Sequence, residues 1–333
     1  MQGNDIHPVD GNFRGNPENE SPRGLSRASG PPMQSGLKLF EERWKYLKAQ
    51  ESFRRKPLLI AWRLISWLTK CRLQKPAVIN LPEWNVRMFL PPEWRGIAKL
   101  VFAFREDYEP EMACLKRILS PGSVFIDAGA NVGIYTLAAS RIVGETGRVL
   151  AFEPSVQSFP VLEKNIALNS LTNVRAFPVA LTQKNGRAWL HRGPNPTLNS
   201  LGRDPSWKED GEEIVTKTLD QALHHAGVDR VDVIKMDVQG AEELVLRGAW
   251  DIVRSARPIV IFEVWPEGAV LLGLSPNGAW ELLESAGYKF FAVRCGGTFS
   301  LIKSPPAIGN VVAIYEEMRS KLWSQAERIP CNP

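Results

Sequence analysis

The sequence predicts an α/β fold with a doubly wound, mostly parallel sheet. Beyond Gly122, apolar runs of strand length alternate with stretches that have helical spacing. Five of the runs are hydrophobic almost throughout, as expected for parallel strands covered on both faces. A sheet with helices on both sides produces this alternation. The five runs are SVFIDAG, RVLAFEP, VRAFPVAL, VDVIKMDV and PIVIFEV, and YKFFAVR and NVVAIYE follow near the end of the chain.

Composition and pattern divide the chain into five segments. Residues 1–36 are rich in Gly, Pro, Ser and Asn, which predicts a disordered tail. Residues 37–75 are expected to form a basic, amphipathic helical extension. The main domain is expected to begin with short strands and a helix over residues 76–120, to continue with its core over residues 121–318, and to end before a tail at residues 319–333.

The charge of the chain is unevenly distributed. Formal net charge is +5 at pH 7, yet residues 37–75 alone hold eleven Lys/Arg and three Asp/Glu. A basic segment on a mildly acidic body argues against a nucleic-acid partner. The cysteines lack the spacing of a disulfide scaffold or a zinc knuckle, which indicates a reducing, cytoplasmic setting. They are Cys71, Cys114, Cys295 and Cys331.

Residues 57–70, PLLIAWRLISWLTK, are apolar almost all round, with Arg63, Ser66 and Lys70 on one narrow stripe. The run is shorter than the roughly 20 residues that a membrane-spanning helix needs. Two interpretations remain open. The first is a basic, Trp-bearing helix that attaches the protein peripherally to an anionic membrane surface. The second is a helix packed on the main domain or on a second subunit, and the oligomeric state is not predicted.

The segment FIDAGANVGIY predicts a ligand-binding turn between a strand and a helix. Asp127 ends the strand, and Gly129 and Gly133 allow tight backbone geometry and close approach of a ligand. The helix that begins near Gly133 offers free N–H groups. The next strand ends on Glu153, where a carboxylate can accept hydrogen bonds from both ribose hydroxyls of a nucleoside.

Two nucleoside cofactors fit this outline. A dinucleotide prefers the spacing GxGxxG, in which glycine brings the backbone against a pyrophosphate. Here the spacing is GxxxG, with Asn131 between Gly129 and Gly133, and Asp127 precedes it. A carboxylate there is unfavourable for pyrophosphate but suits a ligand with an ammonium and a sulfonium group. S-adenosylmethionine is such a ligand.

Further carboxylates end the fourth and fifth predicted strands. VIKMDVQGAEE supplies Lys235, Asp237 and Glu242, and IVIFEVWPE supplies Glu263. If these strands are neighbours, Asp237 and Glu263 lie close together, and one of the two gains a raised pKa suited to a base near neutral pH. The pair could instead hold a divalent cation, although no metal is predicted. Structural interpretations compete: Asp237 as a helix cap, Glu263 paired with Lys235, and Glu242 as an acidic residue at a helix start.

The ordered series of motifs resembles the FkbM family of S-adenosylmethionine-dependent methyltransferases. The matching segments are FIDAGANVGIYTL, LAFEPSVQSFPVLEKNIALN, VDVIKMDVQGAEELVLRGA and PIVIFEVWP, and the resemblance covers roughly residues 105–316. It implies a class I methyltransferase fold with a seven-stranded sheet whose last strand is antiparallel. It also implies O-methylation of a hydroxyl on a sugar, a glycolipid or a secondary metabolite, so that the partner is a small-molecule or glycan acceptor.

The resemblance also implies roles for particular residues. Glu153 would bind the ribose, Pro154 would shape its turn, and Val179 and Ala180 would flank the adenine. Asn199 and Ser200 are similar to a polar pair that faces the acceptor in the family. The implied cofactor loop consists of Asp127, Gly129, Asn131 and Gly133.

Gln239 departs from the family pattern. Where the motif usually reads DVEGAE, this chain reads DVQGAE. Glutamine keeps the size and the hydrogen-bonding reach of glutamate, but it cannot act as a base or as a charged metal ligand. If the family's glutamate is the base, this protein uses Asp237 or Glu263 instead, or it is a catalytically impaired nucleoside-binding protein. A nicotinamide-dependent oxidoreductase on a related sheet is the remaining alternative.

Overall fold

The computed structural model describes residues 51–94, 96–194, 198–208 and 210–318. The tail expected at residues 1–36, the start of the extension at residues 37–50 and the tail at residues 319–333 lie outside the described residues. The boundaries drawn between the segments from the sequence remain predictions.

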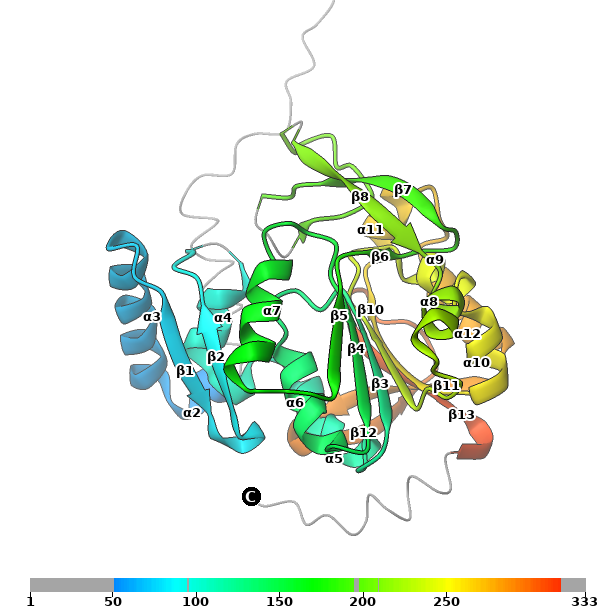
Figure 1. The fold of residues 1–333 in the computed structure, drawn as a ribbon, viewed down its shortest axis with the longest axis horizontal. Helices are drawn as coiled ribbons and strands as arrows, with labels where there is room; N and C mark the ends of the chain where they lie inside the picture. Colours follow the sequence, from blue (N-terminus) through cyan, green and yellow to red (C-terminus); the bar gives the residue numbers. More distant parts are fainter. Residues whose placement is uncertain (1–50, 95, 195–197, 209, 319–333) are drawn as a thin grey trace, which may run out of the picture. The chain divides into compact units, whose positions relative to one another are not determined.

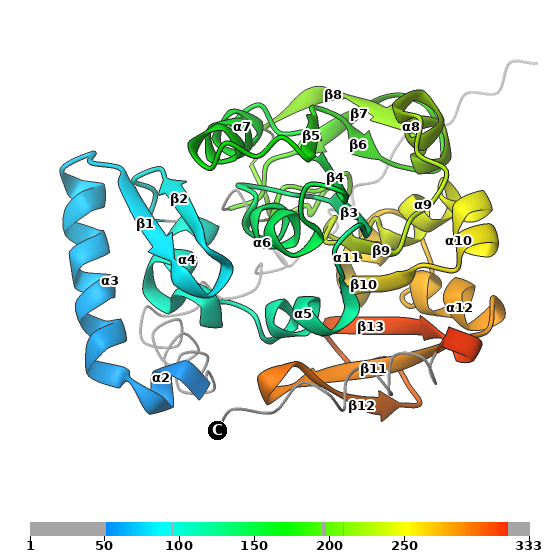
Figure 2. The same cartoon turned by 60° about the horizontal axis from the view of Figure 1, so that its bottom comes forward.

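Figure 1 shows β5, β4 and β3 side by side in the main sheet, whose full order can be followed in Figure 2 and is β12-β11-β13-β10-β9-β3-β4-β5. Strands β5, β4, β3, β9 and β10 are parallel, and β13 pairs antiparallel with both β10 and β11. The expected class I arrangement is therefore confirmed. The strand count differs, because β12 adds an eighth strand at the edge beside β11. The strands are β3 (Val124–Ala128), β4 (Arg148–Phe152), β5 (Val174–Phe177), β9 (Val233–Met236), β10 (Ile259–Val264), β11 (Tyr288–Arg294), β12 (Thr298–Ile302) and β13 (Gly309–Tyr315).

Helices cover both faces of this sheet, and each face has its own core. Neighbouring residues of β3 illustrate the alternation: Phe125 packs in one core and Ile126 in the other, and both are fully buried. One face is covered by α6 (Ile134–Val143) and α5 (Leu115–Ile118), beside which lies α7 (Phe159–Leu168). The other is covered by α8 (Leu219–Ala226), α9 (Glu242–Arg247), α10 (Trp250–Ala256) and α12 (Gly278–Ser285).

The predicted run VRAFPVAL is not one strand, and that prediction was wrong. Strand β5 ends at Phe177, and β6 (Ala180–Leu181) belongs to a separate sheet. Pro178 lies between them, and a proline cannot donate to a strand ladder. The amide of Val179 turns back to the carbonyl of Phe177 at 2.9 Å. The second sheet has the order β6-β8-β7, with β7 (Gly186–His191) and β8 (Gly211–Lys217) antiparallel.

The N-terminal part of the described chain is a helix–hairpin–helix unit. Figure 2 shows α3 beside β1, on the side away from the main sheet. Trp67 of α3 packs its ring 4.8 Å from that of Phe102 on α4, and Arg63 donates to the carbonyl of Ala103. The elements are α2 (Glu51–Arg55), α3 (Pro57–Arg72), β1 (Ala77–Leu81), β2 (Val86–Leu90) and α4 (Ile97–Phe104).

Asn165 of α7 and Asn169, the residue that follows this helix, pair with the backbone of β2 as a neighbouring strand would. Asn165 accepts from the amide of Phe89 at 2.6 Å and donates to its carbonyl at 3.2 Å. Asn169 does the same for Arg87, at 2.7 and 2.6 Å. The match follows from geometry, since four helical residues rise about 6 Å and two strand residues about 6.6 Å. Asn165 also donates to the carbonyl of Val132, which links the hairpin to the loop after β3.

Short helices complete the described chain. They include α11 (Pro266–Leu271) and the 3-10 turns η1 (Pro82–Trp84), η2 (Arg105–Asp107), η3 (Pro110–Cys114), η5 (Cys295–Gly297) and η6 (Glu316–Met318). The helix expected from about Pro110 corresponds to η3 and α5. Within the described residues, none of the helices has the length and apolar character needed to cross a membrane.

Candidate active site

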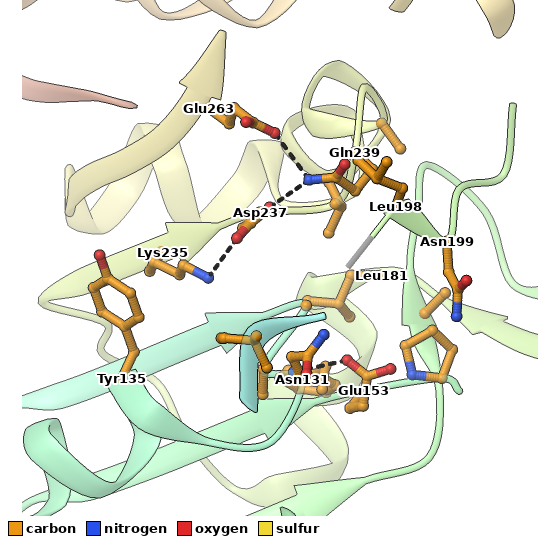
Figure 3. A pocket seen from close by; sticks show the side chains of 18 of the residues that line it. Asn131, Tyr135, Glu153, Leu181, Leu198, Asn199, Lys235, Asp237, Gln239 and Glu263 are labelled. Carbon is orange, nitrogen blue, oxygen red and sulfur yellow. Dashed lines mark hydrogen bonds and ion pairs between the residues drawn. The ribbon is translucent and has the colours of Figure 1, made fainter. Parts of the chain in front are cut away.

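A cavity of about 270 Å³ lies at the carboxyl ends of β3, β4, β9 and β10. The loop after β3 and the turn after β4 form one side of it. The polar ends of β9 and β10 form another, and the second sheet contributes Ala180, Leu181 and Leu190 (Figure 3). This is the edge at which open α/β sheets bind ligands, as the sequence predicted.

The loop after β3 is held against both neighbouring strands. Gly129 has φ +76°, and a Cβ there would overlap the backbone oxygen of Asp237 at the end of β9. Its amide donates to the carbonyl of Phe152 at 2.9 Å. Asn131 follows with φ +49°, and its amide donates to Glu153 Oε2 at 2.8 Å. The glycine is therefore required where two strand ends meet, which brings Asn131 and Glu153 to the same wall.

Glu153 is buried, with 6% of its surface exposed. Its second oxygen, Oε1, accepts from the amide of Ser155 at 2.9 Å. Burial is the main reason that its pKa is raised to about 7, and the two backbone amides oppose the rise. A carboxylate has about four lone-pair positions, so each oxygen can accept one more hydrogen bond. Such a group, in the wall of a cavity with Pro154 and Phe152 beside it, fits the ribose of S-adenosylmethionine.

Asp127, Gly133 and Val179 are not among the described residues that line the cavity. Asp127 is fully buried and accepts from Thr136 Oγ1 at 2.6 Å, while its other oxygen lies 3.8 Å from Lys235 Nζ. A Cβ on Gly133 would meet the side chain of Leu162 on α7. Asp127 and Gly133 support the loop from outside the cavity, whereas Gly129, Asn131, Glu153, Pro154 and Ala180 line it.

Lys235, Asp237, Gln239 and Glu263 form a connected network on the opposite wall (Figure 3). Lys235 Nζ lies 3.4 Å from Asp237 Oδ2. The Gln239 side-chain nitrogen donates to Asp237 Oδ1 at 2.9 Å and to Glu263 Oε2 at 3.0 Å. The strands β9 and β10 are neighbours, and they bring Asp237 and Glu263 to either side of one amide group.

The network separates the roles of its charged members. Burial alone would lower the pKa of Lys235, but Asp237 and Asp127 outweigh it and hold that pKa above its usual value. Lys235 is therefore a cation rather than a base. Burial, followed by the charge of Asp237, raises the pKa of Glu263 to about 9, so this carboxyl is protonated near neutral pH. Asp237, with 35% of its side chain exposed, is the carboxylate of the network that is open to the cavity.

Glu242 and Ser200 support the network from outside the cavity. Glu242 Oε1 accepts from the amide of Val238 at 3.0 Å, and Glu242 is not among the described lining residues. Ser200 donates to the backbone oxygen of Gln239 at 2.8 Å. Its neighbour Asn199 lines the cavity and accepts from the amide of Gly193. The backbone of His191 pairs with that of Ser200.

Sequence reasoning missed four polar residues of the lining: Tyr108, Glu109, Tyr135 and Asn310. The hydroxyl of Tyr135 donates to Glu109 Oε2 at 2.5 Å. Burial is the main cause of a raised pKa in both groups. The only sequence signal for Glu109 is the acidic stretch REDYEPE before the core, which has no motif spacing.

Within the part of the chain that the structure describes, no three His, Cys, Asp or Glu side chains are grouped so as to hold a metal ion. Asp237 and Glu263, the pair considered for a cation, have the amide of Gln239 between them.

The chain is similar in sequence to known methyltransferases. Residues 127–290 match the family model described as the methyltransferase FkbM domain. Methyltransferase sdnD of Sordaria araneosa is 32% identical over 203 residues, which cover 50% of this chain and 74% of that protein. The 2-O-methyltransferase NoeI of Sinorhizobium fredii is 28% identical over 152 residues, covering 41% of this chain and 61% of that protein. Among solved structures, methyltransferase FkbM of Methylobacillus flagellatus aligns with 14% identity and a TM-score of 0.38, over 66% of this chain and 53% of its own. The sequence matches show that this protein belongs to the FkbM family of methyltransferases.

Proposed function

We propose that the protein transfers the methyl group of S-adenosylmethionine to a hydroxyl oxygen of a neutral glycan, glycolipid or secondary metabolite. The observation that carries the proposal is one cavity with two walls. Glu153 and the loop around Gly129 form the first wall, and the network of Asp237, Gln239 and Glu263 forms the second. The similarity to NoeI, a 2-O-methyltransferase, supports oxygen as the atom that is methylated.

When bound, S-adenosylmethionine supplies an electrophilic methyl group on a sulfonium. Glu153 would accept hydrogen bonds from the ribose, in the part of the cavity that Phe152 and Pro154 also line. Asp237 would accept the proton that the acceptor hydroxyl loses on methylation. Gln239 donates to one oxygen of Asp237 and Lys235 lies 3.4 Å from the other, so each oxygen keeps a lone pair with which to accept from the acceptor hydroxyl. The positive charge of Lys235 stabilises the ionised carboxylate of Asp237.

The charge of the lining favours an uncharged acceptor. Lys235 is the basic side chain among the described lining residues, and it is already paired with Asp237 and Asp127. Glu109 and Asp237 line the same cavity, together with Tyr135 and Asn310. A phosphate or carboxylate on the acceptor would therefore lack a cation to bind and would be repelled. Polyols and sugars instead match the many hydrogen-bonding groups.

The proposal is tested with ¹³C-methyl-labelled S-adenosylmethionine and a set of neutral, amino and acidic sugars and lipid-linked glycans. We expect a new O-methyl resonance from neutral acceptors and none from phosphorylated or carboxylated ones. Labelled product on nitrogen or carbon would contradict oxygen as the target. Tight cofactor binding without turnover on any acceptor, together with restored turnover in Gln239→Glu, would support the impaired nucleoside-binding protein instead.

A further inference from the structure

The outward face of α3 carries large apolar side chains that remain exposed. Leu58, Trp62 and Ile65 are 85%, 63% and 67% exposed. Their spacing of four and three residues places them on one stripe of the helix. Thr69 and Arg72 continue the same stripe, and both are exposed. Three neighbouring apolar side chains in water, one of them a tryptophan, are unfavourable unless something covers them.

The opposite face of α3 already has its partner. Ile60, Trp67 and Cys71 are buried. The Trp67 indole donates to the carbonyl of Glu93 at 2.9 Å, and Arg63 donates to the carbonyl of Ala103 at 2.9 Å. The helix is therefore fixed on α4 by its inner face. Its outward stripe is not the side by which it joins the main domain.

The segment around this stripe is strongly basic. Residues 51–75 contain seven Lys/Arg and one acidic residue. The first turn of α3 has no acidic residue, and its last turn contains Lys70 and Arg72. Lys56 before the helix and Lys75 after it are exposed. A short apolar stripe with a tryptophan and basic residues at both ends has the composition of a helix that lies in the plane of an anionic bilayer.

We propose that the outward stripe of α3, defined as Leu58, Trp62 and Ile65 with the exposed Lys56, Arg72 and Lys75 at its ends, docks the protein on an anionic lipid surface. The apolar side chains enter the boundary between headgroups and acyl chains. The basic side chains contact the lipid phosphates. The charge favours this occupant over a second copy of the chain, because two such faces brought together would place like charges side by side.

The docking surface is close in the fold to the cavity. Helix α3 packs on α4, and Ile97, the first residue of α4, lines the cavity. Helix α4 therefore links the docking helix to the cavity. A lipid-linked acceptor would benefit most, but the docking surface does not depend on which acceptor is methylated.

The test is co-sedimentation of the full chain with vesicles, in the absence of cofactor and acceptor. The vesicles contain phosphatidylcholine alone or phosphatidylcholine with 30% phosphatidylglycerol. We expect binding to the anionic vesicles that weakens with added salt, and at least about tenfold weaker binding to the neutral vesicles. The triple variant Leu58→Ser/Trp62→Ser/Ile65→Ser should lose at least about tenfold in affinity for the anionic vesicles.

Two further variants make the result specific. Val270→Ser/Leu301→Ser/Ile308→Ser changes three other exposed apolar side chains and should bind vesicles like the wild type. Arg72→Glu/Lys75→Glu keeps the apolar stripe and should lose the preference for anionic lipid. The proposal is overturned if the stripe variant binds anionic vesicles as tightly as the wild type does. It is also overturned if the wild type binds neutral and anionic vesicles with the same affinity. It is also overturned if the wild type forms a dimer that the stripe variant abolishes, while neither binds lipid. Because no methyl transfer is measured, failure here leaves the proposed activity unaffected.

Discussion

Gln239 Nε2 lies 3.0 Å from Oε2 of Glu263, and the same nitrogen donates to Asp237. One neutral amide group thus satisfies two carboxyl groups that would otherwise repel each other. The resemblance to the FkbM family indicates that glutamate is usual at this position. A third carboxyl there would need a proton or a cation in place of the two N–H groups.

The variant Gln239→Glu should therefore become dependent on cations. We expect its thermal unfolding temperature to fall below that of the wild type as pH rises from 6 to 9, because three carboxyl groups then share one site. Mg²⁺ or Mn²⁺ should restore the unfolding temperature of the variant and leave the wild type unchanged. Differential scanning fluorimetry measures both. Gln239→Ala removes the amide without adding charge, and a cation response in that control would contradict the explanation.

Asp237 and Glu263 should differ in their importance for catalysis. Asp237→Asn should lower kcat by about 10²- to 10⁴-fold, as for loss of a general base. S-adenosylhomocysteine should bind this variant as it binds the wild type. Glu263→Gln should lower kcat by less than about tenfold, because Glu263 is already protonated near neutral pH and glutamine preserves its shape. Steady-state kinetics with calorimetric binding separates the two. Equal losses in both variants would show that Glu263 takes part in proton transfer.

The ligand-free protein should become less stable as pH rises from about 5 to 9. Burial is the first cause of the raised pKa values of Glu111, Glu153 and Glu242, each to about 7, and of Glu263, to about 9. Carboxyl groups of this kind hold more protons in the folded than in the unfolded state between their two pKa values, so the free energy of unfolding falls with rising pH there. We expect the unfolding temperature to fall by at least about 5 °C across this window.

The control for this pH dependence is Glu153→Gln. It removes one of the titrating groups, so its unfolding temperature should fall less steeply between pH 5 and 7 than that of the wild type. A stability that rises across the whole window would mean that these carboxyl groups are ionised in the folded protein.

Asn165 and Asn169 should each contribute measurably to the free energy of unfolding, because they hold the hairpin of β1 and β2. Each pairs a side-chain amide with both backbone groups of one residue of β2. Truncation leaves those groups without partners, which costs about 1–3 kcal/mol per site in the free energy of unfolding. Urea unfolding of Asn165→Ala and Asn169→Ala measures this cost. Asn80→Ala, at an exposed position of β1, is the matched control and should be nearly neutral. Similar losses in all three would argue against a specific role for α7.

Much of the fold follows from local patterns in the sequence. Continuous apolar runs separated by helical spacing predicted the five parallel strands, and their final residues predicted where the cavity lies. Gly129, Glu153 and Asp237 were found because each ends or follows a strand, and parallel strands end at one edge of the sheet. The prediction of a single strand across Pro178 was wrong. It relied on the continuous hydrophobic run and gave too little weight to the proline, which has no backbone N–H to donate to a strand ladder. Strand β12 lacked a continuous apolar run.

Other features depend on contacts between distant segments, which local patterns do not contain. Glu109 meets Tyr135 across 26 residues, and nothing in either local sequence indicates the pairing. Asp127 has the sequence position of a lining residue, but it is fully buried behind the loop, where it holds Thr136. The departure at Gln239 was visible in the sequence. That the Gln239 side chain lies between the carboxyl groups of Asp237 and Glu263 is evident only from the hydrogen-bond distances in the structure.

The most direct test of the account is calorimetric titration of S-adenosylmethionine, S-adenosylhomocysteine and NAD into the full chain and into Glu153→Ala. We expect both adenosyl-sulfur ligands to bind one site and NAD not to bind. Loss of the Glu153 carboxylate should weaken binding by about 10- to 100-fold, as for hydrogen bonds to a charged group. Binding of NAD but not of S-adenosylhomocysteine would contradict the account and make an oxidoreductase the leading interpretation. Unchanged affinity in Glu153→Ala would show that the ribose is held elsewhere.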